Sequence, residues 1–281
     1  MRRKNKPVVE IFDNIRKIYT FSVPRPELVD YVEFFSESSH EETNRYIGDE
    51  NFTVKMFPSF TPTIYINLGA PYQIQLGDKS YVIKQHEDVL IVRDGIAERH
   101  NLPNDHILTI KFFPGGLEAI FGINQAKFIN KVIDVSDIIP ASLIYNINQR
   151  TNFEERVQLL QNLFLQNLLH KQSKDHYVTF VQDTIQVYET SGMQYNNSQL
   201  AEKMFTTSKT INRYFNNVVG TTPKHYFSIF RTRVALGAFV NRKDSFDPSD
   251  FGYYDMSHFY KDVVKFTDQK LRCLNHDLGG F

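Results

Sequence analysis

The 281-residue sequence contains a single cysteine, Cys273. A chain with one cysteine can form neither an intrachain disulfide nor a zinc site built from several cysteines. No stretch approaches the roughly 18 consecutive apolar residues of a membrane span. The basic residues 1–7 are followed by alternating polar and apolar residues and not by the continuous apolar segment of a secretory signal. We therefore expect a cytoplasmic protein with no membrane partner.

The sequence also lacks net charge, because 32 basic residues balance 32 acidic ones. A whole-chain balance can conceal a local patch. Residues 203–233 contain six Lys and Arg and no Asp or Glu. This stretch suits a polyanionic partner, although a merely solvated basic face would give the same composition. The length itself favours two domains over one.

The N-terminal half shows a β-rich pattern over residues 52–113, where short apolar runs alternate with Gly, Asp, Asn and Pro turn signals. The pattern predicts an antiparallel β-barrel or sandwich. Before it, helical spacing of apolar residues in 26–35 predicts a flanking helix. After Gly116 the pattern becomes helical. The expected fold class is α+β with two domains, the second of them all-α.

Residues 153–172 have the spacing of a long helix with a wide apolar face, which fits either a core helix lying on the barrel or a homodimer contact. The polar segment 170–175 that follows is the expected linker. We therefore expect an N-terminal domain at residues 1–172 and a helical domain at 176–281.

A helix-turn-helix is predicted over residues 198–220. Ser198 can cap a first short helix, and Thr207 or Ser208 can cap a second that ends at Gly220. The second helix places its apolar residues on one side and leaves hydrogen-bonding groups outward, with no acid among them. These are Lys209, Thr210, Asn212, Arg213 and Asn216. Arg, Lys and Asn are the residues that read base edges in the major groove of DNA.

The spacing of this unit is matched in full by a known pattern: a Leu-Ala pair, S-x-x-x-L-x-R-x-F, then Gly, Pro, Tyr, Arg and Ala. The matching residues are Leu200, Ala201, Thr207, Ile211, Arg213, Phe215, Gly220, Pro223, Tyr226, Arg231 and Ala235. Thr207 and Ile211 replace Ser and Leu. The chain thus resembles the AraC/XylS family of transcription regulators.

The same family has a second helix-turn-helix, and its signature G-F/Y-x-D-x-S-H-F-x-R/K is matched by Gly252, Tyr253, Asp255, Ser257, His258, Phe259 and Lys261. The resemblance implies a linker helix over about 223–241 and a second recognition helix over about 256–266, in successive major-groove segments. The sequence departs from the family where Asp247-Pro248 replaces the usual Ile-Ala pair, and at Val263, Val264 and Asp268. A single-turn helix capped by Asp247 can replace the supporting helix, and the second unit is then expected to read DNA weakly or to contact only phosphates.

The resemblance sorts the expected DNA contacts. Lys209, Asn212 and Arg213 would touch bases, together with Thr210 and Asn216 on the same face. Lys203, Lys224, Arg231 and Lys261 would lie nearer phosphates. Ser257 and His258 would lie near DNA or serve as helix caps. Double-stranded DNA is the expected partner, and RNA polymerase a further one.

The N-terminal half resembles more loosely the cupin-like sensor domains of such regulators, in the segment 112–116 (FFPGG) and the helix after it. This resemblance implies a small-molecule effector, a homodimer, or both. Residues expected to line the barrel for an effector are Phe57, Phe60, Tyr65, Tyr72, Tyr81 and Arg93, although alternation along strands makes any of them a core residue as well.

Enzyme signatures are weak. The sequence lacks the clustered His-x-His of cupin metalloenzymes, and its His86, Glu87, Glu98, His100 and His106 fit surface or loop positions. Neither a G-x-S-x-G motif nor a phosphate-binding glycine loop occurs. We predict no catalytic residue, no cofactor and no metal site. The alternatives are a cupin-like metalloenzyme with a helical accessory domain and an adaptor with a degenerate DNA-binding domain.

Overall fold

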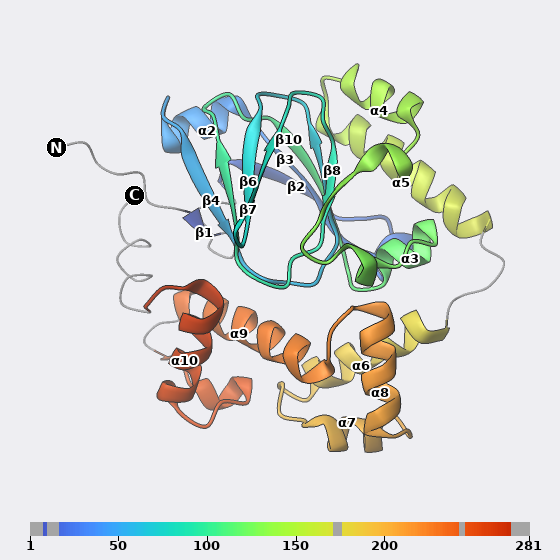
Figure 1. Ribbon diagram of the computed structural model, residues 1–281, viewed down its shortest axis with the longest axis vertical. Coiled ribbons are helices and arrows are strands. Elements are labelled where there is room, and N and C mark those ends of the chain that lie inside the picture. Colours follow the sequence, from blue (N-terminus) through green and yellow to red (C-terminus); the bar gives the residue numbers. More distant parts are fainter. Residues whose placement is uncertain (1–7, 10–16, 171–175, 242–244, 271–281) are drawn as a thin grey trace.

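The computed structural model describes residues 8–9, 17–170, 176–241 and 245–270. The chain has an N-terminal domain of two β-sheets with flanking helices and a C-terminal domain of helices, an α+β arrangement (Figure 1). The predicted fold class is therefore confirmed.

The first sheet has the strand order β1-β4-β9-β6-β7. Its strands are β1 (Val8–Val9), β4 (Phe52–Met56), β9 (Ala97–Asn101), β6 (Tyr72–Leu76) and β7 (Lys79–Ile83). All neighbours are antiparallel except β1 and β4. Along β6 buried side chains alternate with more exposed ones, so this sheet has one solvent-facing side.

The second sheet has the order β11-β8-β5-β10-β3-β2. Its strands are β11 (Val132–Asp134), β8 (Val89–Ile91), β5 (Thr63–Asn67), β10 (Ile107–Phe112), β3 (Val32–Ser38) and β2 (Tyr19–Ser22). Every residue of β5 and β10 is buried, because one side faces the first sheet and the other is covered by helices. Burial on both sides explains why these strands read as almost continuous apolar runs.

Short helices surround the sheets. They are η1 (Pro26–Leu28), α2 (His40–Ile47), α3 (Gly116–Phe121), η2 (Gln125–Phe128), η3 (Val135–Asp137) and α4 (Ala141–Asn148). The long helix α5 (Phe153–His170) buries Val157, Leu160 and Phe164 in the core beside the second sheet. The core interpretation of this helix is confirmed, and the homodimer contact through 153–172 stays a prediction.

The predicted helix over 26–35 is wrong. Only residues 26–28 form one short turn, and Val32 and Phe35 lie in β3, which pairs with β2 and β10. Both side chains are fully buried. Apolar spacing that suits a helix also suits a strand covered on both faces, and here the strand pairing prevails.

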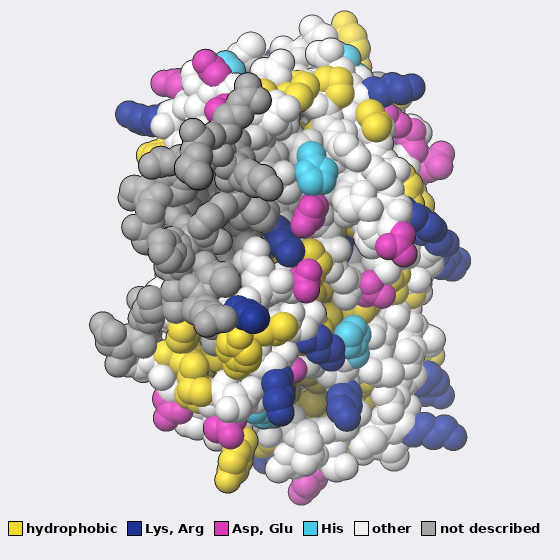
Figure 2. Space-filling view, turned by 60° about the vertical axis from the view of Figure 1, so that its left-hand side comes forward, with side chains coloured by type: hydrophobic (Ala, Val, Ile, Leu, Met, Phe, Trp, Pro, Cys, Tyr) yellow, Lys and Arg dark blue, Asp and Glu magenta, His cyan; other side chains and the backbone are white. Residues whose placement is uncertain are grey.

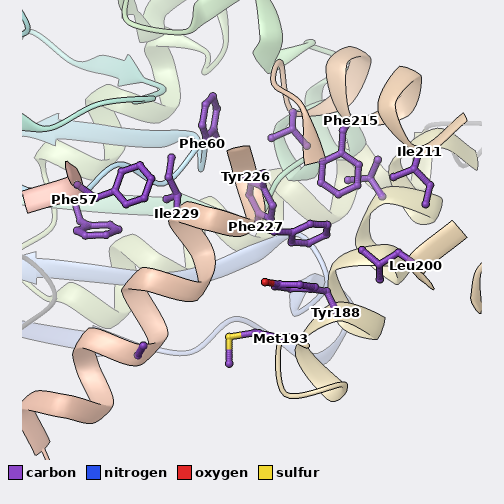
Figure 3. Close-up of a cluster of buried hydrophobic side chains, with 14 of the residues drawn as sticks. Phe57, Phe60, Tyr188, Met193, Leu200, Ile211, Phe215, Tyr226, Phe227 and Ile229 are labelled. Atoms are coloured by element: carbon purple, nitrogen blue, oxygen red, sulfur yellow. The ribbon is translucent and has the colours of Figure 1, made fainter. Parts of the chain in front are cut away.

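The C-terminal domain consists of α6 (His176–Thr190), α7 (Asn197–Lys203), α8 (Ser208–Val218), α9 (Pro223–Asn241), η5 (Pro248–Phe251) and α10 (Met256–Thr267). The sequence predicts the extents of α9 and α10 to within a residue. Their apolar faces share one core with α6, α7 and α8. Figure 3 shows the part of this core to which α6, α7, α8 and α9 contribute.

That core also includes residues of the N-terminal domain. Phe57, Phe60 and Ala119 belong to the same buried cluster as the helices, and Figure 3 shows Phe57 and Phe60 near Ile229 on α9. The ring of Phe57 lies 6.3 Å from that of Phe266. The two domains are therefore joined by continuous apolar packing.

Polar contacts cross the same junction. The amide of Gln125 donates to the backbone oxygens of Phe60 and Val219, at 2.8 and 3.2 Å. Asn124 Nδ2 donates to the oxygen of Asn217 at 2.8 Å. Gly220, with φ +88°, fits against η2 so closely that a Cβ there would lie 2.3 Å from Cδ1 of Ile129. The end of α8 is thus fixed directly on the N-terminal domain.

Candidate nucleic-acid interface

The first helix-turn-helix is built by caps at both helix starts. Asn196 caps α7 in a reciprocal capping box with Gln199, two residues before the expected Ser198. Thr207 caps α8 by accepting from the backbone N–H of Thr210 at 3.2 Å, as predicted. Helix α8 buries Ile211, Phe215 and Val218, which lie about one turn apart on one side of the helix. The opposite side therefore faces solvent.

That opposite side carries the predicted reading residues. Lys209, Arg213 and Asn216 are exposed, and Thr210 and Asn212 are half-buried. The guanidinium of Arg213 lies over the ring of Tyr214, 5.0 Å from its centroid. Arg213 Nη2 also donates to the Tyr214 hydroxyl at 3.4 Å, so Tyr214 holds the side chain beside the helix while the other guanidinium donors stay exposed.

Of the four side chains expected near phosphates, Lys203, Lys224 and Lys261 are exposed. Arg231 is different. Its Nη2 donates to Asp262 at 3.0 Å and its Nη1 to the oxygen of Gly252 at 3.1 Å. Its guanidinium also lies 4.1 Å from the centre of the Tyr253 ring. Arg231 therefore ties α9 to the second helix-turn-helix, and the structure does not offer it to a phosphate.

The second helix-turn-helix is shortened where the sequence departs from the AraC/XylS pattern that it resembles. The single-turn helix η5 replaces the supporting helix, and Asp247 caps it by accepting from Ser249 N–H at 2.9 Å, as predicted. Asp255 caps α10 by accepting from His258 N–H at 2.7 Å, so neither Ser257 nor His258 is the capping side chain. Both of these residues are exposed at the start of α10.

The linker helix α9 sets the spacing of the two units. Figure 1 shows α8 and α10 on either side of α9, both in the half of the molecule away from the sheets. In the rotated view of Figure 2, that half carries several Lys and Arg side chains. A rigid element between two helix-turn-helix units is the arrangement that allows two recognition helices to enter one DNA duplex.

An open depression of about 500 Å³ lies between α6 and α8, at the turn that precedes α8. Its lining is partly aromatic and consists of His176, Thr179, Phe180, Asp183, Met204, Phe205, Thr206, Thr210 and Tyr214. Thr210, one of the predicted reading residues, thus forms one wall of this depression.

The predicted effector residues fall into two groups. Phe57 and Phe60 do not line the space between the sheets, because both pack against the C-terminal domain. Tyr65, Tyr72 and Tyr81 do lie in or against the apolar cluster between the sheets. The sequence could not separate the groups, since the C-terminal rings that Phe57 and Phe60 contact, Phe266 and His225, are more than 150 residues away.

Arg93 is fully buried and is held by the protein itself. Its Nη1 donates to the hydroxyl of Tyr65 at 2.9 Å and its Nη2 to the backbone oxygen of Phe57 at 3.4 Å. Arg93 therefore connects the space between the sheets to the interdomain contact.

A polar cluster between the sheets was not foreseen. The buried guanidinium of Arg99 donates to the hydroxyl of Tyr19, lies 4.0 Å from Asp105 Oδ2, and faces the rings of Tyr65 and Tyr72. Burial raises the pKa of Asp105 and of Tyr72 above their usual values. Alternate residues of β9 are buried, which places Arg99 and Asn101 inward, but the segment is polar in sequence and carries no apolar alternation that could have predicted this.

The histidines and acids considered for a metal do not form a common site. His106 pairs with Glu37 at 2.8 Å, whereas His100 lies near Glu98 at 3.8 Å and bonds Thr53. Within the ranges that the structure covers, no group of three His, Cys, Asp or Glu side chains could hold a metal ion. No described helix is long and apolar enough to cross a membrane.

Comparison with known proteins gives structural similarity only. No family model matches the chain, and no curated protein matches it. Among solved structures, it is similar to ToxT from Vibrio cholerae, with a TM-score of 0.47 and 11% identity over 82% of this chain and 99% of that one. A structure of ToxT bound to an unsaturated fatty acid gives a TM-score of 0.45 at 10% identity, over 82% and 96% of the chains. The AraC-like transcriptional activator CuxR gives 0.28 at 11% identity, over 79% and 87%.

Proposed function

We propose that this chain is a sequence-specific, DNA-binding transcription regulator of the AraC/XylS type that acts in the cytoplasm and is not an enzyme. The observation that supports this most strongly is the polar, acid-free side of α8, where Lys209, Arg213 and Asn216 are exposed on a capped helix. A second capped helix, α10, lies on the other side of the linker helix α9. In a helix-turn-helix, the second helix reads bases with residues near its N-terminus.

The proposed roles follow from exposure. Lys209, Asn212 and Arg213 read bases in one major-groove segment, with Thr210 and Asn216 beside them. Lys203, Lys224 and Lys261 contact phosphates. Ser257 and His258 lie at the start of α10, where they contact the second segment. The domains are taken as 1–172 and 176–281.

For the N-terminal domain we propose a small-molecule effector bound between the sheets, with Tyr65, Tyr72 and Tyr81 as lining. The Tyr72 hydroxyl and Arg99 Nε are buried there and have no hydrogen-bond partner among the described residues. A buried polar atom without a partner is unfavourable, and an effector with hydrogen-bonding groups would satisfy both. A homodimer through α5 and a contact with RNA polymerase remain predictions.

Selection of bound duplexes from a random pool, followed by mobility shifts with variants, tests the DNA-binding proposal. Arg213→Ala should weaken binding to the selected site by about 1 to 3 kcal/mol and relax the preference at one position. Lys224→Ala should weaken binding to all sequences alike and lower the salt slope by about 1. Lys79→Ala, an exposed lysine on β7, is the matched control and should change neither quantity.

One result would overturn the proposal. If the wild-type protein retains no duplex even at low salt, where phosphate contacts are strongest, the helices do not bind DNA. An adaptor with a degenerate domain would then be the better description.

A further inference from the structure

Two aromatic side chains stand out on the surface of the C-terminal domain. Phe205 is 98% exposed and Tyr254 is 92% exposed, the highest values among the described large apolar residues. Each lies in the turn of one helix-turn-helix unit. Two such rings in corresponding turns of one domain point to a common use, because a fully exposed ring contributes nothing to the protein core.

The backbone at Phe205 strengthens this inference. Phe205 has φ +50°, a left-handed conformation that favours glycine, whereas the second unit uses Gly252 with φ +71° in its turn. An aromatic residue in this conformation is strained, and such strain is typical of functional positions. Nothing in the fold requires the ring, since glycine would fit the same turn more easily.

The position of the rings points to DNA. Phe205 stands two residues before Thr207, the cap of α8, and Tyr254 stands one residue before Asp255, the cap of α10. These are the helix ends that enter the groove. Phe205 also shares the wall of the open depression with Thr210.

The charges around Phe205 suit a polyanion. Lys203 and Lys209 are exposed on either side of Phe205, with Glu202 as an exposed acid nearby. Within seven residues of Tyr254 along the chain the exposed charges are mixed, Lys261 on one side and Asp247, Asp250 and Asp255 on the other, with the carboxylate of Asp255 accepting from the backbone N–H of His258. The occupant of the apolar surface at Phe205 is therefore expected to carry phosphates, and Tyr254 is assigned to the same duplex by its place in the second helix-turn-helix.

We propose that Phe205 and Tyr254 pack against thymine methyl groups at the edges of the two major-groove segments, and so act as specificity-determining residues. This inference rests on the proposed DNA-binding function. The C5-methyl of thymine is the apolar group that the major groove presents, and Phe is a residue that contacts it. The two rings make thymine, and not only guanine or adenine, part of the preferred site.

Substitution of deoxyuridine for thymine provides a direct test, because it removes only the methyl group. Each thymine of the selected duplex is replaced singly, and affinity is measured for the wild type and for Phe205→Gly. The wild type should lose about fourfold in affinity at one thymine in each of the two segments, the fold-change that corresponds to about 0.8 kcal/mol for one buried methyl group. The glycine variant should bind the thymine and uracil duplexes equally at the position next to α8 and keep the loss at the position next to α10.

The variants separate this effect from misfolding. Glycine adopts the conformation of residue 205 without strain, so Phe205→Gly should fold. Tyr254→Ala should remove the thymine preference in the other segment only. Tyr145→Ala is the control, since Tyr145 is a 64% exposed ring on α4 in the other domain, and this variant should keep the full response of the wild type.

Three outcomes count against the inference. If Phe205→Gly responds to uracil at the same positions as the wild type, the ring does not contact a methyl group. If it binds every duplex as the wild type does but fails to activate RNA polymerase in a purified transcription assay, the ring contacts a protein instead. If the wild type binds no duplex at all, the proposed function itself fails, and that result is distinct from the other two.

Discussion

Replacement of Gln125 by leucine is expected to destabilise the protein through the contact between its domains. The Gln125 side chain is fully buried, and its Oε1 accepts from the backbone N–H of Gly115 at 3.0 Å. Its Nε2 donates to the oxygens of Phe60 and Val219. One carboxamide thus bonds three backbone segments, of which one belongs to the C-terminal domain.

The magnitude follows from the groups left without a partner. Leucine is similar in size to glutamine but has no polar atoms, so Gln125→Leu leaves one N–H and two carbonyl oxygens unbonded. Each buried unpaired group costs about 1 to 3 kcal/mol. Because the bond to Val219 is longer than the other two, we count mainly the two shorter bonds and expect a total loss of about 2 to 6 kcal/mol in the free energy of unfolding.

Urea unfolding followed by circular dichroism measures this loss as a fall in the transition midpoint. Gln125→Glu keeps an acceptor for the Gly115 N–H but loses the donor, and its charge is buried, so it should also be destabilised. Gln166→Leu, at an exposed position of α5, is the matched control and should change the free energy by less than about 0.5 kcal/mol. If Gln125→Leu unfolds at the midpoint of this control, Gln125 does not hold the domains together.

Two further changes test other contacts. Burial raises the pKa of Asp88 to about 6, although the Asn67 backbone N–H donates to it and opposes the shift. The folded state then holds more protons than the unfolded chain between pH of about 4 and 6, so stability falls as pH rises through that window. Asp88→Asn should be more stable than the wild type at pH 7.5, by at most about 3 kcal/mol, and should lose this advantage at pH 4. If the difference in urea midpoint between variant and wild type is the same at both pH values, the prediction is wrong. Arg231→Ala should lower the free energy of unfolding, measured by thermal unfolding, by about 2 to 3 kcal/mol, because Asp262 and the Gly252 oxygen lose their donor. The salt slope of DNA binding should stay unchanged. A slope lower by about 1 would show that Arg231 does contact a phosphate.

The C-terminal domain could be predicted closely because its signals are local. The cap at Thr207, the start of α9 at Pro223 and the short helix after Asp247 each depend on residues within one turn of the chain. Helix spacing then places the polar residues of α8 outward without knowledge of any other segment.

The N-terminal domain was less predictable because its decisive contacts are distant in the sequence. The segment containing Val32 and Phe35 becomes a strand only through pairing with β10. Strand β9 was missed because Arg99 faces inward, against the usual apolar pattern. The position of Arg231 likewise depends on Asp262, a partner 31 residues away, and a family pattern cannot show that this bond occupies the side chain.

The apolar cluster that contains Phe57, Phe60 and the faces of α8, α9 and α10 has a consequence for any attempt to study the halves separately. A fragment that begins at α6 would leave the surface under Phe57 and Phe60 in contact with water, and a fragment that ends at α5 would do the same to those two rings. Such fragments are expected to be poorly soluble and less stable than the whole chain. In the intact polypeptide, heating or denaturant should melt both halves in one transition.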